Sequence, residues 1–240
     1  MSITPEQAAH DTREAVLRVP GRFMQDAATY AHAAALGFEG ADFYIAGRGS
    51  ALGDVPASVV TAALVFFSPD VVAPAWERSA GVMSRQETAL EWAGGLHKYA
   101  WEHDAAQVDW EQLSTLLGRV VAFAPVAGAP LFAGWRELPE PEDAPALAFH
   151  RLNALRELRG ALHGAAVLTV GLSPAEAIAV RTPDMARSFG WIDVPADPGP
   201  FNERWALAEA RTDRMFGRHL GVLDGDERET LVEMLGTLVS

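Results

Sequence analysis

The chain has 240 residues, of which 49% are hydrophobic, and it contains no cysteine. This length and composition predict one or two globular domains with a sizeable core, and they exclude disulfides, thiolate metal ligands and a cysteine nucleophile. The formal net charge is −13, which disfavours a nucleic-acid partner because phosphate backbones repel an acidic surface.

Helix start and stop signals recur through the first 67 residues. Thr4 followed by Pro5 predicts the start of a helix, which we expect to stop before Pro20. Gly37 is typical of the position just after a helix end. The further segments that we expect to be helical are 22–36, 39–48 and 59–67. The β-branched residues of the last segment make a strand the competing interpretation.

Capping signals continue toward the middle of the chain. Ser68, followed by proline, opens a helix that Pro74 is expected to kink or break. Ser84 with a glutamate three residues later has the pattern of a capping box and opens another helix. Asp109 with a glutamine three residues later opens the next one.

A segment rich in proline and glycine, 126–145, is predicted to be an irregular connector packed on the body of the protein. It separates an N-terminal helical half, 1–125, from a C-terminal helical half, 146–240. The second half opens with the longest uninterrupted helical pattern, about 144–170. A capping box at Ser173 starts the next helix, and the last expected helices lie at 182–190, 202–218 and 226–239. No Asn-Gly or Asp-Gly hairpin separates alternating strands, so we predict an all-α fold with a long central helix.

One polar stripe runs along the predicted central helix. At 100° per residue, Arg156, Arg159 and His163 fall within an arc of roughly 100°, with Asn153 at its edge. One interpretation is that this stripe faces solvent or pairs with carboxylates elsewhere in the chain. The other is a ligand site, because arginine presents a fixed donor fork to an anion and histidine exchanges a proton near neutral pH.

The ligand-site interpretation predicts roles for particular residues. His163 and His150 are the candidate catalytic residues, because histidine can move a proton. The candidate ligand-binding residues combine the arginines with neighbouring polar and aromatic side chains: Arg48, Asn153, Arg156, Arg159, Tyr44 and Trp135.

Signals for a metal or a cofactor are weak, so we expect neither. His97, His103 and Asp104 lack the i, i+4 spacing that places two metal ligands on one helix face. The glycine-rich segment 47–53 is superficially like a phosphate-binding loop, but it follows a predicted helix and lacks the Gly-Lys-Ser/Thr ending. No Gly-x-Ser-x-Gly elbow of a hydrolase is present.

Several stretches resemble an actinobacterial family of helical proteins labelled helix-turn-helix. The stretches are 43–53, 128–133 and 149–163, and the most specific one reads Arg156-Glu157-x-Arg159-Gly160-x-x-His163. The order and spacing of these stretches match the family pattern over most of the chain. Family members have an acidic residue directly after the Arg-Gly pair, where this chain has alanine, so a role for that carboxylate does not transfer. The resemblance implies helical halves like winged helices, and an association with specialised metabolism that favours a small organic ligand.

Three functions remain open from the sequence. The first is a protein that binds a small aromatic or anionic organic molecule between its two halves, which includes a cofactor-free enzyme. The second is a transcriptional regulator with its helix-turn-helix at 173–189, where Arg181 and Arg187 are the nearby basic residues. The third is a structural or partner-binding helical protein. We expect a cytoplasmic location without a membrane partner, because the sequence shows no signal peptide and no apolar run of ~20 residues. The sequence is also compatible with a homodimer.

Overall fold

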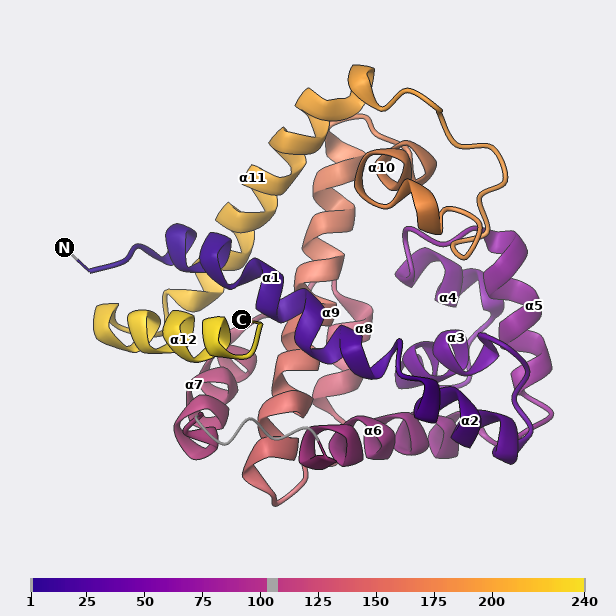
Figure 1. Ribbon diagram of the computed structural model, residues 1–240, viewed down its shortest axis with the longest axis horizontal. Coiled ribbons are helices and arrows are strands. Elements are labelled where there is room, and N and C mark those ends of the chain that lie inside the picture. Colours follow the sequence, from indigo (N-terminus) through magenta and orange to yellow (C-terminus); the bar gives the residue numbers. More distant parts are fainter. Residues whose placement is uncertain (1, 103–107, 240) are drawn as a thin grey trace.

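Figure 1 shows the computed structural model, which describes residues 2–102 and 108–239. All regular elements within these residues are helices, so the predicted all-α fold is confirmed. The helices are α1 (Pro5–Phe23), α2 (Ala27–Leu36), α3 (Asp42–Gly49), η1 (Ser50–Leu52), α4 (Ala57–Ala63), α5 (Pro69–Ser79), α6 (Arg85–Glu102), α7 (Trp110–Phe123), α8 (Pro130–Arg136), α9 (Ala144–Thr169), α10 (Pro174–Arg181), η2 (Pro183–Met185), η3 (Gly199–Phe201), α11 (Asn202–Leu220) and α12 (Gly225–Thr237).

Helix α9 is the centre of the molecule, and α1, α6, α7, α8 and α11 all pack against it (Figure 1). It has 26 residues and begins where the side chain of Asp143 accepts a hydrogen bond from the backbone N–H of Ala146. Such a cap satisfies one of the free N–H groups that every helix start leaves. The helix ends before Gly171, whose φ of 77° lies in the left-handed region that glycine adopts without strain. The predicted central helix therefore agrees with the structure.

Two smaller apolar clusters flank the main core. One cluster joins α3, α4, α5 and α8 through residues that include Ile45, Val60 and Trp76. The other lies where the C-terminal end of α9 meets α10 and α11, around Val167 and Ala208. In Figure 1 the α3, α4 and α5 group lies on one side of α9, and α10 with the upper part of α11 lies near its C-terminal end. The space between these groups holds the pocket described below.

The predicted helix end before Pro20 was wrong, and the helix at Pro74, which we expected to be kinked or broken, is not broken. Helix α1 continues through Pro20 to Phe23, and α5 runs unbroken through Pro74. A proline inside a helix removes one backbone hydrogen bond, and this loss can be offset by burial of the neighbouring side chains. Around Pro74, Val72 and Trp76 are almost completely buried. Tertiary packing thus overrides the local signal.

Other boundaries also differ from the predictions. The first turn of the predicted 39–48 helix is a loop, and α3 begins at Asp42. The segment predicted as either helix or strand near 59–67 forms α4 at Ala57–Ala63, so the helix interpretation is correct. The predicted irregular segment 126–145 contains the short helix α8, which packs on α9. The division of the chain into two halves stays a prediction.

The helix predicted at 182–190 contains only the short 3-10 helix η2, so the helix-turn-helix expected at 173–189 lacks a second α-helix. The junction between α9 and α10 has the geometry of such a motif instead. The two helices are bent by 110° at a short break that contains Gly171. The side chain of Ser173 accepts from the backbone of Glu176, and the Glu176 carboxylate accepts from the backbone of Ser173, so a complete capping box starts α10. Among the described residues no single helix is long and apolar enough to cross a membrane, although α9 and α10 taken together satisfy that criterion of length and composition.

Candidate functional site

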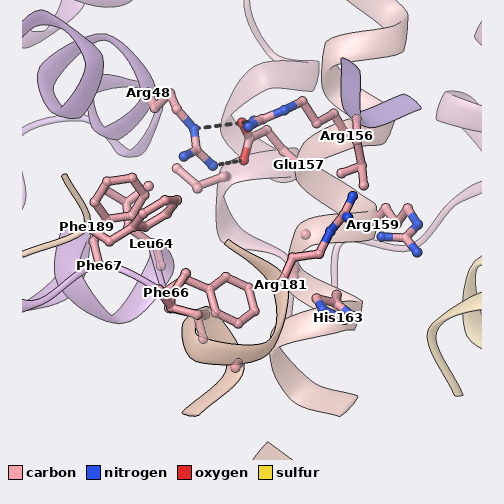
Figure 2. Close-up of a pocket in the computed structure, with 18 of the residues that line it drawn as sticks. Arg48, Leu64, Phe66, Phe67, Arg156, Glu157, Arg159, His163, Arg181 and Phe189 are labelled. Carbon is pink, nitrogen blue, oxygen red and sulfur yellow. Dashed lines mark hydrogen bonds and ion pairs between the residues drawn. The ribbon is translucent and has the colours of Figure 1, made fainter. Parts of the chain in front are cut away.

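A pocket of about 240 Å³ lies against the middle of α9, and the surrounding elements close it from several sides (Figure 2). Most of the wall opposite α9 is apolar and comes from the turn after α4 and from α10 with its following loop. The residues that form this wall are Leu64, Val65, Phe66, Phe67, Ala177, Ile178 and Phe189. The volume suits a small organic molecule better than a single water molecule.

Glu157 of α9 is the centre of a buried ion-pair group at one side of the pocket. Its carboxylate accepts from Nε of Arg48 at 3.0 Å and from Nη2 of Arg48 at 2.8 Å, a fork that the dashed lines of Figure 2 show. Nη1 of Arg156 donates to the same carboxylate at 2.9 Å. Arg48 also donates from Nη1 to the hydroxyl of Tyr44 at 2.7 Å. Burial alone would raise the pKa of Glu157, but the charges of Arg48 and Arg156 outweigh burial and hold this pKa below its usual value.

The glycine-rich segment around Arg48 serves packing in this structure. It forms the end of α3, so it is part of a helix. A Cβ on Gly47 would lie 2.4 Å from the ring of Trp92, and a Cβ on Gly49 would lie 2.8 Å from a methyl group of Val60. Both glycines therefore let α3 approach its neighbours closely, which holds Arg48 against α9.

His163, also on α9, is the second polar feature of the pocket. Its Nδ1 lies 3.0 Å from the hydroxyl of Thr212 on α11, and that hydroxyl donates to the carbonyl of Ala208 at 2.7 Å. The imidazole ring lies between two aromatic rings, Phe66 at a centroid distance of 5.6 Å and Trp205 at 5.0 Å. Burial lowers the pKa of His163 to about 4, so its ring is neutral at pH 7.

Arg159 is buried beside His163 and is held by carboxylates of α11. Its Nη2 lies 2.8 Å from Oε2 of Glu209 and 3.4 Å from Oδ1 of Asp213. Glu209 also lies 3.7 Å from Arg13 of α1. Arg181 of α10 is different, because its side chain is 55% exposed and its closest carboxylate, Glu14, is 4.0 Å away. Figure 2 shows Arg181 extending from α10 toward Arg159.

The structure brings together five of the eight residues predicted from the sequence. These five line the pocket: Tyr44, Arg48, Arg156, Arg159 and His163. The other three, His150, Asn153 and Trp135, are buried elsewhere in the core.

His150 lies outside the pocket and pairs with another histidine. Its Nδ1 is 3.0 Å from Nε2 of His97, and the ring of Trp135 packs edge-on against it. Burial, followed by the nearby charge of His97, lowers the pKa of His150 to about 4. His103 and Asp104 lie outside the described residues. The described part of the chain has no group of three or more potential metal ligands.

Sequence reasoning missed the apolar wall and the carboxylates of α11. Phe66 and Phe67 lie in an apolar run of the sequence, but their place beside the central helix depends on how the chain folds back. Trp205 and Glu209 lie four residues apart and therefore share one face of α11. That spacing was the available signal, but without the partner helix it does not distinguish a pocket face from any other helix face.

Comparison with known proteins gives the family of the chain. None of the curated proteins and none of the solved structures matches it. A family model described as a helix-turn-helix family matches residues 9–198, which include α9, α10 and most of the pocket wall. This match confirms the helix-turn-helix part of the resemblance seen in the sequence, and the chain belongs to the helix-turn-helix family.

Proposed function

We propose that the protein binds a small organic molecule with an apolar, ring-shaped body and one anionic group in the pocket beside α9. The observation that carries this proposal is the contrast between the aromatic wall and the charged side of the pocket. Phe66, Phe67 and Phe189 offer a surface for an apolar body. Arginines on the other side offer donors for an anion.

The charge of the pocket supports an anionic ligand. Four arginines and two glutamates line it, so the lining is formally positive in a chain with a net charge of −13. Two of these arginines, Arg48 and Arg159, are already paired with carboxylates, those of Glu157 and Glu209. Arg156 shares Glu157 with Arg48, and its Nε is buried without a hydrogen-bond acceptor among the described residues. A buried donor without an acceptor costs free energy, which an anionic ligand group would recover.

The helix-turn-helix geometry supports DNA binding less well. The second helix of such a motif reads the major groove with polar side chains near its N-terminus. Here α10 has eight residues, begins with Pro174, Ala175 and Glu176, and buries Ala177 and Ile178 against the pocket. An acidic first turn and a negative net charge oppose contact with phosphates. A family name taken from a structural motif does not by itself define a function.

Isothermal titration calorimetry with 2-naphthoate and its neutral analogue 2-naphthamide tests the proposal. We expect 2-naphthoate to bind at least 10-fold more tightly than 2-naphthamide, because only the carboxylate pairs with arginine. Arg156→Met should weaken 2-naphthoate binding at least 10-fold. Arg218→Met is the matched control, because it removes the same charge from an exposed position outside the pocket and should leave the affinity unchanged. No binding of either compound at millimolar concentration, or equal effects of the two variants, would contradict the proposal.

A further inference from the structure

We propose that His163 selects ligands that carry a hydroxyl group, and that Nε2 of its imidazole accepts the hydrogen bond of that hydroxyl. The ligand class is then a hydroxylated aromatic acid, with its hydroxyl at His163 and its anionic group at the arginines. This inference rests on the proposed function, because it specifies the molecule that the same pocket binds.

The single proton of the Thr212 hydroxyl fixes the tautomer of His163. The oxygen of this hydroxyl lies 2.7 Å from the carbonyl oxygen of Ala208 and 3.0 Å from Nδ1 of His163. Two oxygens 2.7 Å apart repel each other unless a proton lies between them, so Thr212 must donate to Ala208. Its oxygen can then only accept from His163. Nδ1 of His163 therefore carries the proton of the neutral ring.

This tautomer decides the role of the other ring nitrogen of His163, Nε2. Because Nδ1 holds the proton, Nε2 of the neutral ring has a free lone pair and can accept a hydrogen bond. No described residue donates a hydrogen bond to Nε2. Oε1 of Glu209 lies 3.8 Å from Nε2, which is too far for a hydrogen bond, and this carboxylate oxygen is itself an acceptor. A ligand that supplies a donor satisfies Nε2, whereas a ligand that offers only acceptors does not.

The surroundings of the His163 ring fix its orientation. Phe66 and Trp205 pack against the imidazole and limit the space around it. Thr212 and Ala208 belong to α11, and both are completely buried, so the orientation of the imidazole is held by the core. The acceptor is therefore preorganised, which strengthens discrimination between ligands because little ordering is needed on binding.

The His163 ring is neutral at pH 7. Burial lowers its pKa to about 4. The charges of Arg159 and Arg181 also lower this pKa, whereas those of Glu209 and Asp213 raise it. The ring is consequently neutral at pH 7, and the lone pair is available. A charged ring would donate from both nitrogens and would prefer an acceptor instead.

Two measurements on the full chain test the inference. The first compares the affinities of 6-hydroxy-2-naphthoate and 6-methoxy-2-naphthoate by calorimetry, with 2-naphthoate as the parent compound. The wild type should prefer the hydroxyl compound to the methyl ether at least 10-fold, because only the hydroxyl donates. His163→Phe keeps a ring of similar shape without nitrogen, so it should reduce this preference below 2-fold.

The second measurement is the ¹⁵N NMR spectrum of the histidine rings at pH 7. We expect the His163 signals, assigned by their loss in His163→Phe, to show a protonated Nδ1 and an unprotonated Nε2. Thr212→Val removes the acceptor of Nδ1, and it should mix the two tautomers and weaken the hydroxyl preference. This measurement on the wild type needs no ligand, and if His163→Phe proves too unstable, the His163 signals are assigned by their loss in His163→Gln.

The outcomes separate this inference from the proposed function. If 2-naphthoate binds but the hydroxyl and methoxy compounds bind equally, the inference fails and the proposed function stands. If Nε2 carries the proton in the wild type, the inference also fails. If none of the naphthoates binds, both are overturned.

Discussion

The buried ion pair between Arg48 and Glu157 makes a sharp prediction about stability. Glu157→Leu removes a carboxylate that is 3% exposed and that accepts two hydrogen bonds from Arg48 and one from Arg156. Arg48, itself 9% exposed, then keeps only the Tyr44 hydroxyl as a hydrogen-bond partner among the described residues. Removing one member of a buried pair typically costs about 3–5 kcal/mol, because the other charge stays buried without compensation. We expect about 3 kcal/mol here, since Arg48 borders a pocket that admits water.

The double variant Arg48→Met/Glu157→Leu provides the decisive comparison. It removes both charges of the Arg48–Glu157 pair and replaces them with apolar side chains of similar length. The uncompensated charge of Arg48 disappears, and of the cations that Glu157 held only Arg156 remains, with a side chain that is 16% exposed. Its free energy of unfolding should lie within about 2 kcal/mol of the wild type. The coupling energy between the two positions then follows from the double-mutant cycle. Urea unfolding at pH 7, extrapolated linearly to water, measures all four proteins.

Glu140→Leu is the matched control for burial. Glu140 accepts the same kind of two-bond fork from Arg151, at 2.7 and 2.6 Å, but its side chain is 42% exposed. Exposed pairs contribute under about 1 kcal/mol, because water screens the charges. A cost for Glu157→Leu as small as that for Glu140→Leu would refute the reasoning, and so would a double variant less stable than the sum of its single variants.

Three further predictions follow from other features of the structure. The free energy of unfolding should fall as pH drops from 6.5 toward 4. His163 has a pKa of about 4 in the folded protein against the usual histidine value of 6.5 in the unfolded chain, so the unfolded chain binds more protons in this window. The loss reaches about 2 kcal/mol for this residue at pH 5. His163→Phe should flatten the pH profile measured by urea unfolding, and an unchanged slope would argue against a buried neutral ring. Gly47→Ala should destabilise the protein by about 1–3 kcal/mol, because the added Cβ clashes with Trp92. Gly94→Ala is the control: a Cβ at this position of α6 meets free space, so the substitution should stabilise the protein by about 0.5–1 kcal/mol. Equal changes in the melting temperatures of the two variants would contradict this packing. A gel shift with random duplex DNA at physiological salt should show no nanomolar, sequence-dependent complex, and finding one would favour the regulator.

The sequence by itself determined the secondary structure to a large extent, because helix signals are local. Thr4, Asp109 and Ser173 each cap a helix as predicted, since a side-chain oxygen needs only the backbone two or three residues ahead. The stripe of Arg156, Arg159 and His163 could likewise be predicted, because helix periodicity depends on one element alone. Errors occurred where packing opposes a local rule, as at the two prolines inside helices.

Only the tertiary structure decided which partners these side chains meet. Glu157 and Arg48 are 109 residues apart, and Arg159 reaches Glu209 across 50 residues, so no local pattern connects them. His150 and His163 have similar apolar surroundings in the sequence, yet one faces another histidine and the other faces the pocket. The difference arises because α6 covers α9 at His150, whereas at His163 α11 contacts the ring through Thr212 and leaves part of the residue at the pocket. Which face of a helix becomes a site is set by the neighbours that leave it uncovered, and those neighbours come from distant parts of the chain.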